Sequence, residues 1–166
     1  MSLDFLDSPC KEPSRNEKLF GLCDDQNGTK AYSDHLNSNN WIAKVINEDQ
    51  VDVTFTPIDL CMNILKAHTN DQESTCDGML TSENCLYLVE LKEQGTGGWL
   101  PKATDQLEST IKLLTKNHDL SGFRFKKAFP CNKRHPNFKV IDHAENLRFF
   151  RNYGFRIDAQ LEVRIR

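Results

Sequence analysis

The sequence lacks several features that would assign it to a class at once. It has no apolar run approaching the roughly 20 residues of a membrane-spanning helix. Residues 1–11 lack the basic start and apolar block of a secretory signal peptide. None of the six cysteines form a C-x-x-C pair, so the thiols are expected to be reduced rather than bound to zinc or joined in disulfides. These absences predict a cytoplasmic protein with no membrane partner.

The composition is that of one globular domain. The chain has 166 residues, of which 38 % are hydrophobic and 27 % are charged, and a chain of this length can bury enough surface to fold without disulfides. The formal net charge of −3 is unevenly distributed. Residues 121–166 hold eleven Lys and Arg against four acids, a net charge of +7 that leaves −10 for residues 1–120. A basic end on an acidic protein permits a face that binds polyanions such as nucleic acid.

Hydrophobic periodicity predicts an α/β fold. Residues 1–30 are polar and interrupted by proline and glycine, so they are expected to form a loose or peripheral N-terminal extension to a single domain of residues 31–166. Helices are expected from helical spacing and helix-start signals in residues 31–48, 57–68, 101–121 and 142–152. Strands are expected in residues 50–56, 75–80, 85–92, 123–131 and 155–165. This order of elements predicts a mixed central sheet with helices packed on it.

Three charged residues stand where two of the predicted strands meet. Asp77 lies on the first strand of a predicted hairpin, and Glu90 and Lys92 end the second. Because side chains alternate along a strand, Glu90 and Lys92 share a face with Leu86 and Leu88, and pairing across the hairpin brings Asp77 close to Glu90. Two opposed carboxylates at the edge of a buried sheet repel each other unless a cation lies between them. Mg²⁺ accepts one or two carboxylates and keeps several waters, so the pattern favours a magnesium site with Lys92 as a fixed positive charge beside it.

Asp77, twelve further residues and then Glu90-Leu91-Lys92, followed by a loop and a helix, resembles the PD-(D/E)xK nuclease superfamily over about residues 40–166. The resemblance implies a restriction endonuclease-like core, in which helices flank a mixed central sheet. It also implies that Asp77 and Glu90 ligate Mg²⁺ or Mn²⁺ and that the Leu91 carbonyl joins them. Lys92 would then be the catalytic lysine. Gln106 resembles a glutamine that RecB-like members carry on the helix after the motif, where it would orient the site.

The sequence departs from this family at two places. The tyrosine that usually stands four residues after the glutamine is Thr110, and the proline usual before the first aspartate is Cys76. Members often carry a further acid on the first core helix. Glu48 and Asp59 are the alternatives for that acid in this chain.

A basic segment follows the motif. Lys126, Lys127, Lys133 and Arg134 flank a strand-to-loop transition that is expected beside Asp77, where they would hold phosphates. The function expected from these residues is a Mg²⁺-dependent nuclease that hydrolyses phosphodiester bonds, with DNA favoured over RNA. The alternative is a catalytically silent nuclease-fold module or subunit that binds protein or nucleic acid. The simplest structural explanation of the motif is a hairpin edge that ends in a surface ion pair. A short chain has little room for a separate recognition domain, so a homodimer or a partner subunit is compatible with either function.

Overall fold

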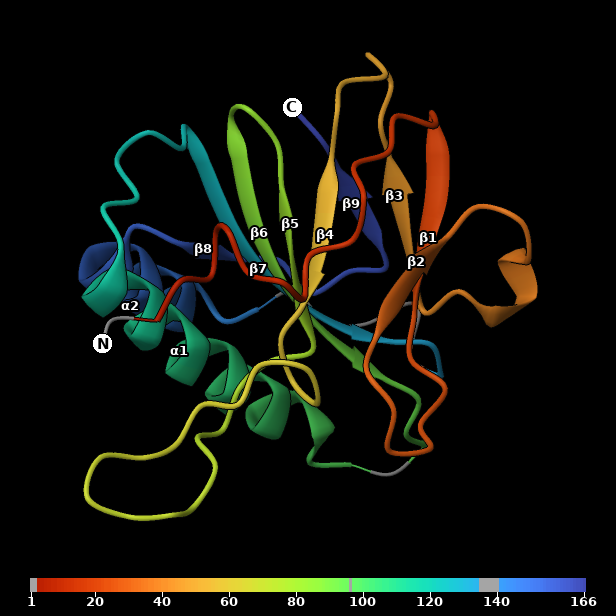
Figure 1. The fold of residues 1–166 in the computed structure, drawn as a ribbon. Helices are drawn as coiled ribbons and strands as arrows, with labels where there is room; N and C mark the ends of the chain where they lie inside the picture. Colours follow the sequence, from red (N-terminus) through yellow and green to blue (C-terminus); the bar gives the residue numbers. More distant parts are fainter. Residues whose placement is uncertain (1–2, 96, 135–140) are drawn as a thin grey trace.

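The computed structural model describes residues 3–95, 97–134 and 141–166, which contain two β-sheets and two α-helices (Figure 1). The strands are β1 (Leu19–Cys23), β2 (Tyr32–Asp34), β3 (Ala43–Ile46), β4 (Thr54–Pro57), β5 (Gly78–Thr81), β6 (Cys85–Lys92), β7 (Phe125–Asn132), β8 (Arg156–Ile157) and β9 (Glu162–Arg164). The helices are α1 (Trp99–Asn117), α2 (His143–Tyr153) and the short 3-10 helix η1 (Ser38–Asn40). None of these described helices has the length and apolar character needed to span a bilayer. The chain is therefore a mixed α/β protein, as the sequence predicts.

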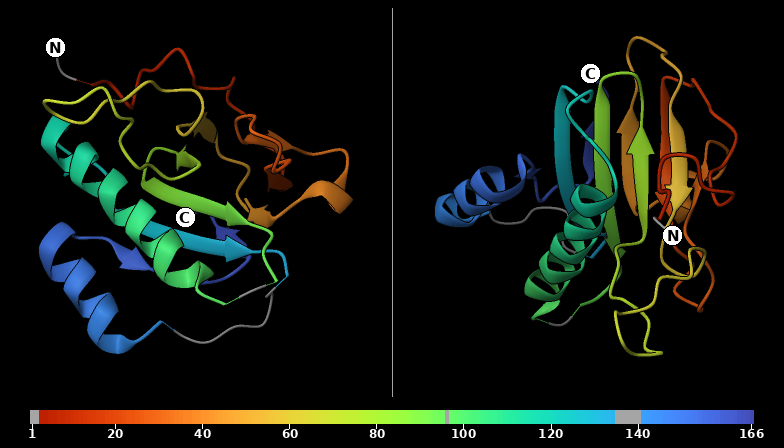
Figure 2. Two further views of the ribbon diagram at one scale, coloured as in Figure 1. Left: turned by 90° about the horizontal axis from the view of Figure 1, so that it is seen from below. Right: turned by 60° about the vertical axis from the view of Figure 1, so that its left-hand side comes forward.

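The larger sheet has the strand order β4-β5-β6-β7-β8. β4, β5 and β6 are antiparallel to one another in turn, whereas β7 is parallel to both β6 and β8. α1 connects β6 to β7, and Figure 2 shows α1 and α2 side by side on one face of this sheet. The apolar stripe that predicts α1 is its buried side, since Ala103, Leu107, Ile111 and Leu114 are completely buried. The prediction of a strand at residues 85–92 is confirmed, and this strand, β6, is central in the sheet.

The smaller sheet, in the order β2-β1-β3-β9, covers the other face of the larger one. Phe20, Val45 and Val163 of the smaller sheet form one apolar core with Tyr87 of β6. The next residue of β6, Leu88, belongs to a second core beneath the helices, because successive side chains point to opposite faces of a strand. The molecule thus has three layers, in which helices cover one face of the larger sheet and strands cover the other (Figure 2).

The N-terminal residues are built into both cores, where the sequence predicts a loose or peripheral extension. β1 is an inner strand of the smaller sheet, and its Phe20 and Leu22 are completely buried. Phe5 is completely buried in the core beneath the helices, and its backbone N–H donates to His118 Nε2 at 3.0 Å. Only a few apolar residues make these contacts, so the mostly polar composition of residues 1–30 does not indicate that the segment packs into the core.

The helix predicted within residues 31–48 is wrong. Ala43–Ile46 form β3, in which buried and exposed side chains alternate. The spacing of Ile42 and Val45 is compatible with a helix, but both residues are β-branched and are equally suited to a strand. Pairing of β3 with β1 on one side and β9 on the other decides between the two conformations.

The helix predicted within residues 57–68 is also wrong. Pro57 is the last residue of β4, an edge strand, and it pairs with Gly78 of β5. Proline is tolerated at this position because no further strand needs its missing N–H. The N–H of the next residue, Ile58, donates to the Asp77 carbonyl at 2.9 Å. Strand pairing therefore continues past the point where a helix start was expected, and no helix lies between β4 and β5 in the described residues.

Cys10 and Cys61 form a disulfide, which contradicts the expectation of reduced thiols. The bond joins the N-terminal segment to the connection between β4 and β5, two segments that are 51 residues apart in sequence. Sequence spacing does not reveal this proximity, because only the fold brings the two Cα atoms within bonding range. The remaining cysteines are free and buried: Cys23, Cys76, Cys85 and Cys131.

The C-terminal half follows the predicted order with one change. α2 ends before Gly154, which adopts a left-handed conformation with φ 75°. The strand predicted at residues 155–165 is divided into β8, at the edge of the larger sheet, and β9, at the edge of the smaller one. The chain therefore passes from one sheet to the other between Ile157 and Glu162.

Candidate functional site

Asp77 and Glu90 lie opposite each other beside the β5–β6 hairpin, as the sequence predicts. The register that pairs Gly78 with Val89 makes Asp77 and Glu90 the next cross-strand pair. The N–H of Asp77 donates to Glu90 Oε1 at 3.0 Å, and the N–H of Leu91 donates to Asp77 Oδ2 at 2.7 Å. The two residues are only 8 % and 2 % exposed. Each carboxylate is thus held by the backbone of the opposite strand and shielded from water.

Lys92 completes the predicted group of three. It lies two residues after Glu90 on the same side of β6 and places its Nζ 3.0 Å from Glu90 Oε2, with 12 % of its side chain exposed. A surface ion pair, the simplest structural explanation of the motif, would be screened by water and worth about 0–1 kcal/mol. This pair is instead largely removed from water, so the loss of either partner would leave a costly unpaired charge.

Burial and mutual repulsion make the two carboxyl groups hard to ionise together. Burial first, and then the charge of Glu90, raise the pKa of Asp77 from 3.8 to about 9, although the hydrogen bond from the Leu91 N–H opposes them. Burial also raises the pKa of Glu90, from 4.5 to about 7, while the charge and hydrogen bond of Lys92 lower it in part. At neutral pH the pair therefore retains a proton unless a further positive charge is present.

This set of donors fits a divalent cation that keeps part of its water shell. A second positive charge beside the pair would let both carboxyl groups ionise, and Mg²⁺ takes only one or two carboxylates from a protein. In residues 3–95, 97–134 and 141–166, no group of three or more His, Cys, Asp or Glu side chains is arranged to hold a metal. The site offers two carboxylates, so a Mg²⁺ or Mn²⁺ ion bound there would take its remaining ligands from water and substrate oxygens.

The loop after β1 approaches the same site, a contact that the sequence analysis missed. The carbonyl of Leu91, the expected third ligand, accepts a hydrogen bond from Gln26 Nε2 at 3.4 Å. The negative charge of Asp24 in this loop contributes to the raised pKa of Asp77. Because residues 1–30 were expected to be peripheral, no feature of the sequence linked Asp24 or Gln26 to the motif.

Asp59, one of the two alternatives for a further acid, lies near the pair, although it is on a loop and not on a helix. Burial, followed by the charge of Asp24, raises the pKa of Asp59, and the charge of Lys92 lowers it. Glu48, the other alternative, is exposed in the turn after β3. The electrostatic neighbourhood of the pair is thus acidic, with Lys92 as the cation in contact with it.

α1 is attached through Thr110 to the segment that precedes β5 and contains Asp77. The Thr110 hydroxyl accepts a hydrogen bond from the Cys76 N–H at 2.8 Å and donates to the Gln106 backbone carbonyl at 2.9 Å. The family resemblance marked Thr110 only as the position of a missing tyrosine, so this role was not predicted. One turn away, the side-chain Oε1 of Gln106 is buried and has no hydrogen-bond partner among the described residues.

The four predicted phosphate-binding residues do not gather at one place. Lys133 and Arg134 follow β7, where the Lys133 N–H donates to the Lys92 carbonyl at 2.9 Å, so they lie at the same end of the sheet as the carboxylate pair. Lys126 and Lys127 lie near the start of β7, at the other end. An extended strand rises about 3.3 Å per residue, so roughly 20 Å separates the two groups.

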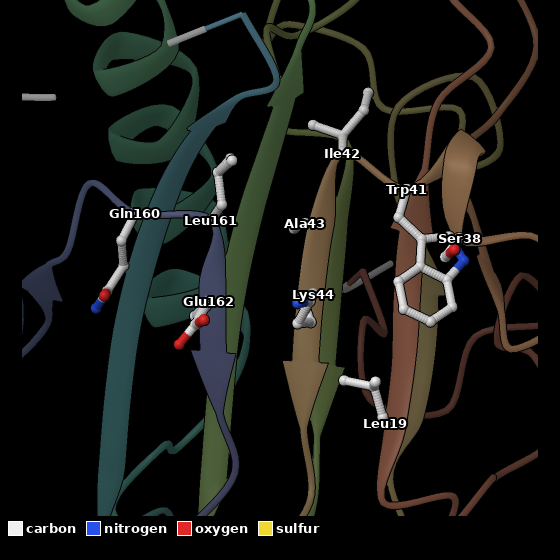
Figure 3. Close-up of a pocket in the computed structure, with 9 residues that line it drawn as sticks. All are labelled: Leu19, Ser38, Trp41, Ile42, Ala43, Lys44, Gln160, Leu161 and Glu162. Carbon is white, nitrogen blue, oxygen red and sulfur yellow. The ribbon is translucent and has the colours of Figure 1, made fainter. Parts of the chain in front are cut away.

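A separate hollow of about 730 Å³ lies on the outer face of the smaller sheet (Figure 3). Leu19, Trp41 and Leu161 form its apolar part, and Lys44 and Glu162 its charged part. None of the predicted site residues lines this hollow. It is therefore not part of the carboxylate site.

Comparison of the chain with family models, with curated proteins and with solved structures gives no match. The class that the fold and site define is a mixed α/β protein with a buried, lysine-paired carboxylate site. The resemblance to PD-(D/E)xK nucleases rests on Asp77, Glu90-Leu91-Lys92 and Gln106.

Proposed function

We propose that this protein is a metal-dependent nuclease that hydrolyses phosphodiester bonds, with DNA favoured over RNA. One observation carries the proposal: Asp77 and Glu90 are buried directly opposite each other, with the Lys92 ammonium 3.0 Å from Glu90. A fold that places two carboxylates together in a low dielectric bears a cost of electrostatic repulsion. A divalent cation removes that cost and gives the arrangement a chemical use.

The chain's own residues divide the work of hydrolysis among them. Asp77 and Glu90 would hold Mg²⁺ or Mn²⁺, which when bound acidifies a coordinated water and polarises the phosphodiester. The backbone N–H groups of Asp77 and Leu91 fix the two carboxylates before substrate arrives. Lys92 holds Glu90 in place and supplies a positive charge that stabilises the negative charge developing on the phosphate oxygens.

A cleavage assay with substituted proteins tests this proposal. Asp77→Asn, Glu90→Gln and Lys92→Met are each expected to lower the rate of Mg²⁺- or Mn²⁺-dependent cleavage by at least about a hundredfold, because each removes a ligand or the fixed charge. Circular DNA, in single- and double-stranded form, and RNA of matching sequence serve as substrates. Glu93→Gln is the matched control, since Glu93 is an exposed acid next to Lys92, and it should cleave like the wild type.

Three results would refute the proposal. Lys92→Met protein that cleaves at the wild-type rate would remove the catalytic lysine from the mechanism. Cleavage that persists in EDTA would show that no divalent cation takes part. Equal cleavage by the wild type and all variants would identify a contaminating nuclease.

One observation favours the alternative, a catalytically silent module that binds protein or nucleic acid. The hydrogen bonds from the backbone N–H groups of Asp77 and Leu91, together with Lys92, already satisfy much of the pair without a cation. In a silent module the Asp77–Glu90 pair would have only a structural role, which is to hold the β5–β6 hairpin in its place in the fold. Calorimetric titration with Mn²⁺ separates the two functions, because a silent module would bind no ion at millimolar concentration.

The partners and the location follow from the same proposal. Nucleic acid is the expected partner, and a homodimer or a partner subunit is compatible with the proposal. A cytoplasmic location stays a prediction, and the Cys10–Cys61 disulfide counts against it because disulfides persist mainly in oxidising compartments.

A further inference from the structure

Five basic side chains line one hollow of about 270 Å³ at the far end of β7 from the carboxylate pair. We call this hollow the basic pocket; its cations are Arg124, Lys126, Lys127, Arg156 and Arg166. They come from the start of β7, from β8 and from the end of the chain. Among the residues that the structure describes, no carboxylate side chain lines the pocket.

Most of this charge is not neutralised within the protein. Lys127 pairs with Asp158 at 3.5 Å, but the other four cations of the basic pocket form no ion pair with any residue in the described part of the chain. α2 ends beside the pocket at Gly154, and a helix C-terminus carries only about half a negative charge. The helix end therefore offsets a small part of the positive charge, and an anionic ligand would offset the rest.

Two aromatic rings hold the arginines of the basic pocket in place. The Arg156 guanidinium lies 4.4 Å from the centre of the Phe150 ring. The guanidinium groups of Arg124 and Arg166 lie 5.3 Å and 5.9 Å from the centre of the Phe125 ring. A guanidinium stacked on a ring keeps the N–H groups at its edge available, and these groups match the oxygens of a phosphate in a two-point contact. The pocket is thus suited to phosphate groups.

We propose that the basic pocket binds the phosphate backbone of a single nucleic acid strand, independently of the carboxylate pair. Lys126 is in register with Leu86, four residues before Glu90, so about 13 Å of strand separates the two sites. The hollow suits a strand that enters it, and Phe150, which is 44 % exposed, offers a surface on which a base can stack. A membrane surface is flat and would leave cations within a hollow unpaired.

Binding of a labelled oligonucleotide tests the proposal without any catalytic step. Fluorescence anisotropy is measured with a single-stranded DNA of about 12 nucleotides, in EDTA, between about 50 and 200 mM salt. The test variant is Arg124→Gln/Arg156→Gln, in which both replaced side chains are exposed, so the fold is retained. The matched control is Lys112→Gln/Lys116→Gln, which removes the same charge from exposed positions on α1 that do not line the pocket.

The wild type is expected to bind with a salt dependence that corresponds to four phosphate contacts, so log Kd should rise with log salt concentration with a slope of about 3, at about 0.7 per contact. Arg124→Gln/Arg156→Gln should weaken binding by about tenfold or more and reduce the slope by about 1.4. The control should bind within about twofold of the wild type. The assay contains EDTA and measures no cleavage, so its outcome is independent of the nuclease proposal.

Two outcomes would overturn the proposal. Equal losses in the test variant and the control would show that only the overall charge matters. Binding of the wild type to vesicles of anionic lipid, with no binding to the oligonucleotide, would assign the basic pocket to a membrane surface instead.

Discussion

Replacement of Asp77 by asparagine is expected to remove a pH dependence from the stability of the metal-free protein. In the unfolded chain Asp77 ionises near pH 3.8, whereas in the folded chain burial and the charge of Glu90 raise its pKa to about 9. Between these two values the folded state binds a proton that the unfolded state does not. The stabilising contribution is therefore complete below about pH 4 and is lost as the pH rises towards 9.

The size of the effect follows from proton linkage. Each pH unit within this range lowers the free energy of unfolding by about 1.4 kcal/mol for one proton, so roughly 3 kcal/mol is lost between pH 6 and pH 8. The raised pKa of Glu90, about 7, adds to the loss in the same direction near its own midpoint. Asparagine carries no charge at either pH, and it can still accept from the Leu91 N–H and donate to Glu90. The free energy of unfolding of Asp77→Asn should therefore rise by about 2–3 kcal/mol relative to that of the wild type between pH 6 and pH 8.

Urea denaturation at pH 6, 7 and 8 in EDTA measures the difference, and equal slopes in urea would show that the unfolding reactions are comparable. Asp52→Asn is the control, since Asp52 is exposed and the change of charge is the same. Its stability should follow the wild type at all three pH values. If the difference between Asp77→Asn and the wild type stays constant from pH 6 to pH 8, the two carboxyl groups do not share a proton and the electrostatic account of the site is wrong.

Three further predictions concern the framework around the site. Serine at both Cys10 and Cys61 should lower the free energy of unfolding by about 4 kcal/mol, because the bond closes a long loop of the unfolded chain; dithiothreitol should destabilise the wild type by the same amount and leave the variant unchanged. Leu107→Ala should cost about 2–5 kcal/mol in urea denaturation, because Leu107 is completely buried between α1 and the larger sheet. A cost below about 1 kcal/mol would contradict that packing. Gly154→Ala should cost about 1 kcal/mol, since Gly154 adopts φ 75° at the end of α2, whereas Gly122→Ala, at a position with open space around it, should cost less.

The hairpin and the helix that follows it could be predicted because their signals are local. The almost continuously apolar run of residues 85–92 predicted a strand that is buried on both faces, and the stripe containing Leu107 predicted the buried side of α1. The meeting of Asp77 with Glu90 needed only an antiparallel hairpin and the alternation of side chains along a strand. These features depend on neighbours a few residues away in the sequence.

The smaller sheet depended on contacts that no local pattern contains. β3 pairs with β9, which lies near the other end of the chain, and this pairing turned a segment with helical spacing into a strand. The approach of Asp24 to the carboxylate pair likewise required β1 to take its place in the smaller sheet.

The sequence by itself determined the carboxylate pair, its lysine and the strands that carry them, because short-range periodicity specifies which side chains share a face. Only the tertiary structure decided where the basic residues lie. Lys126 and Lys133 are close in sequence, yet β7 is extended between them and places one in the basic pocket and the other at the same end of the sheet as the carboxylates. The distance between two residues depends on the backbone conformation between them and on long-range strand pairing, and local sequence patterns do not specify either of these.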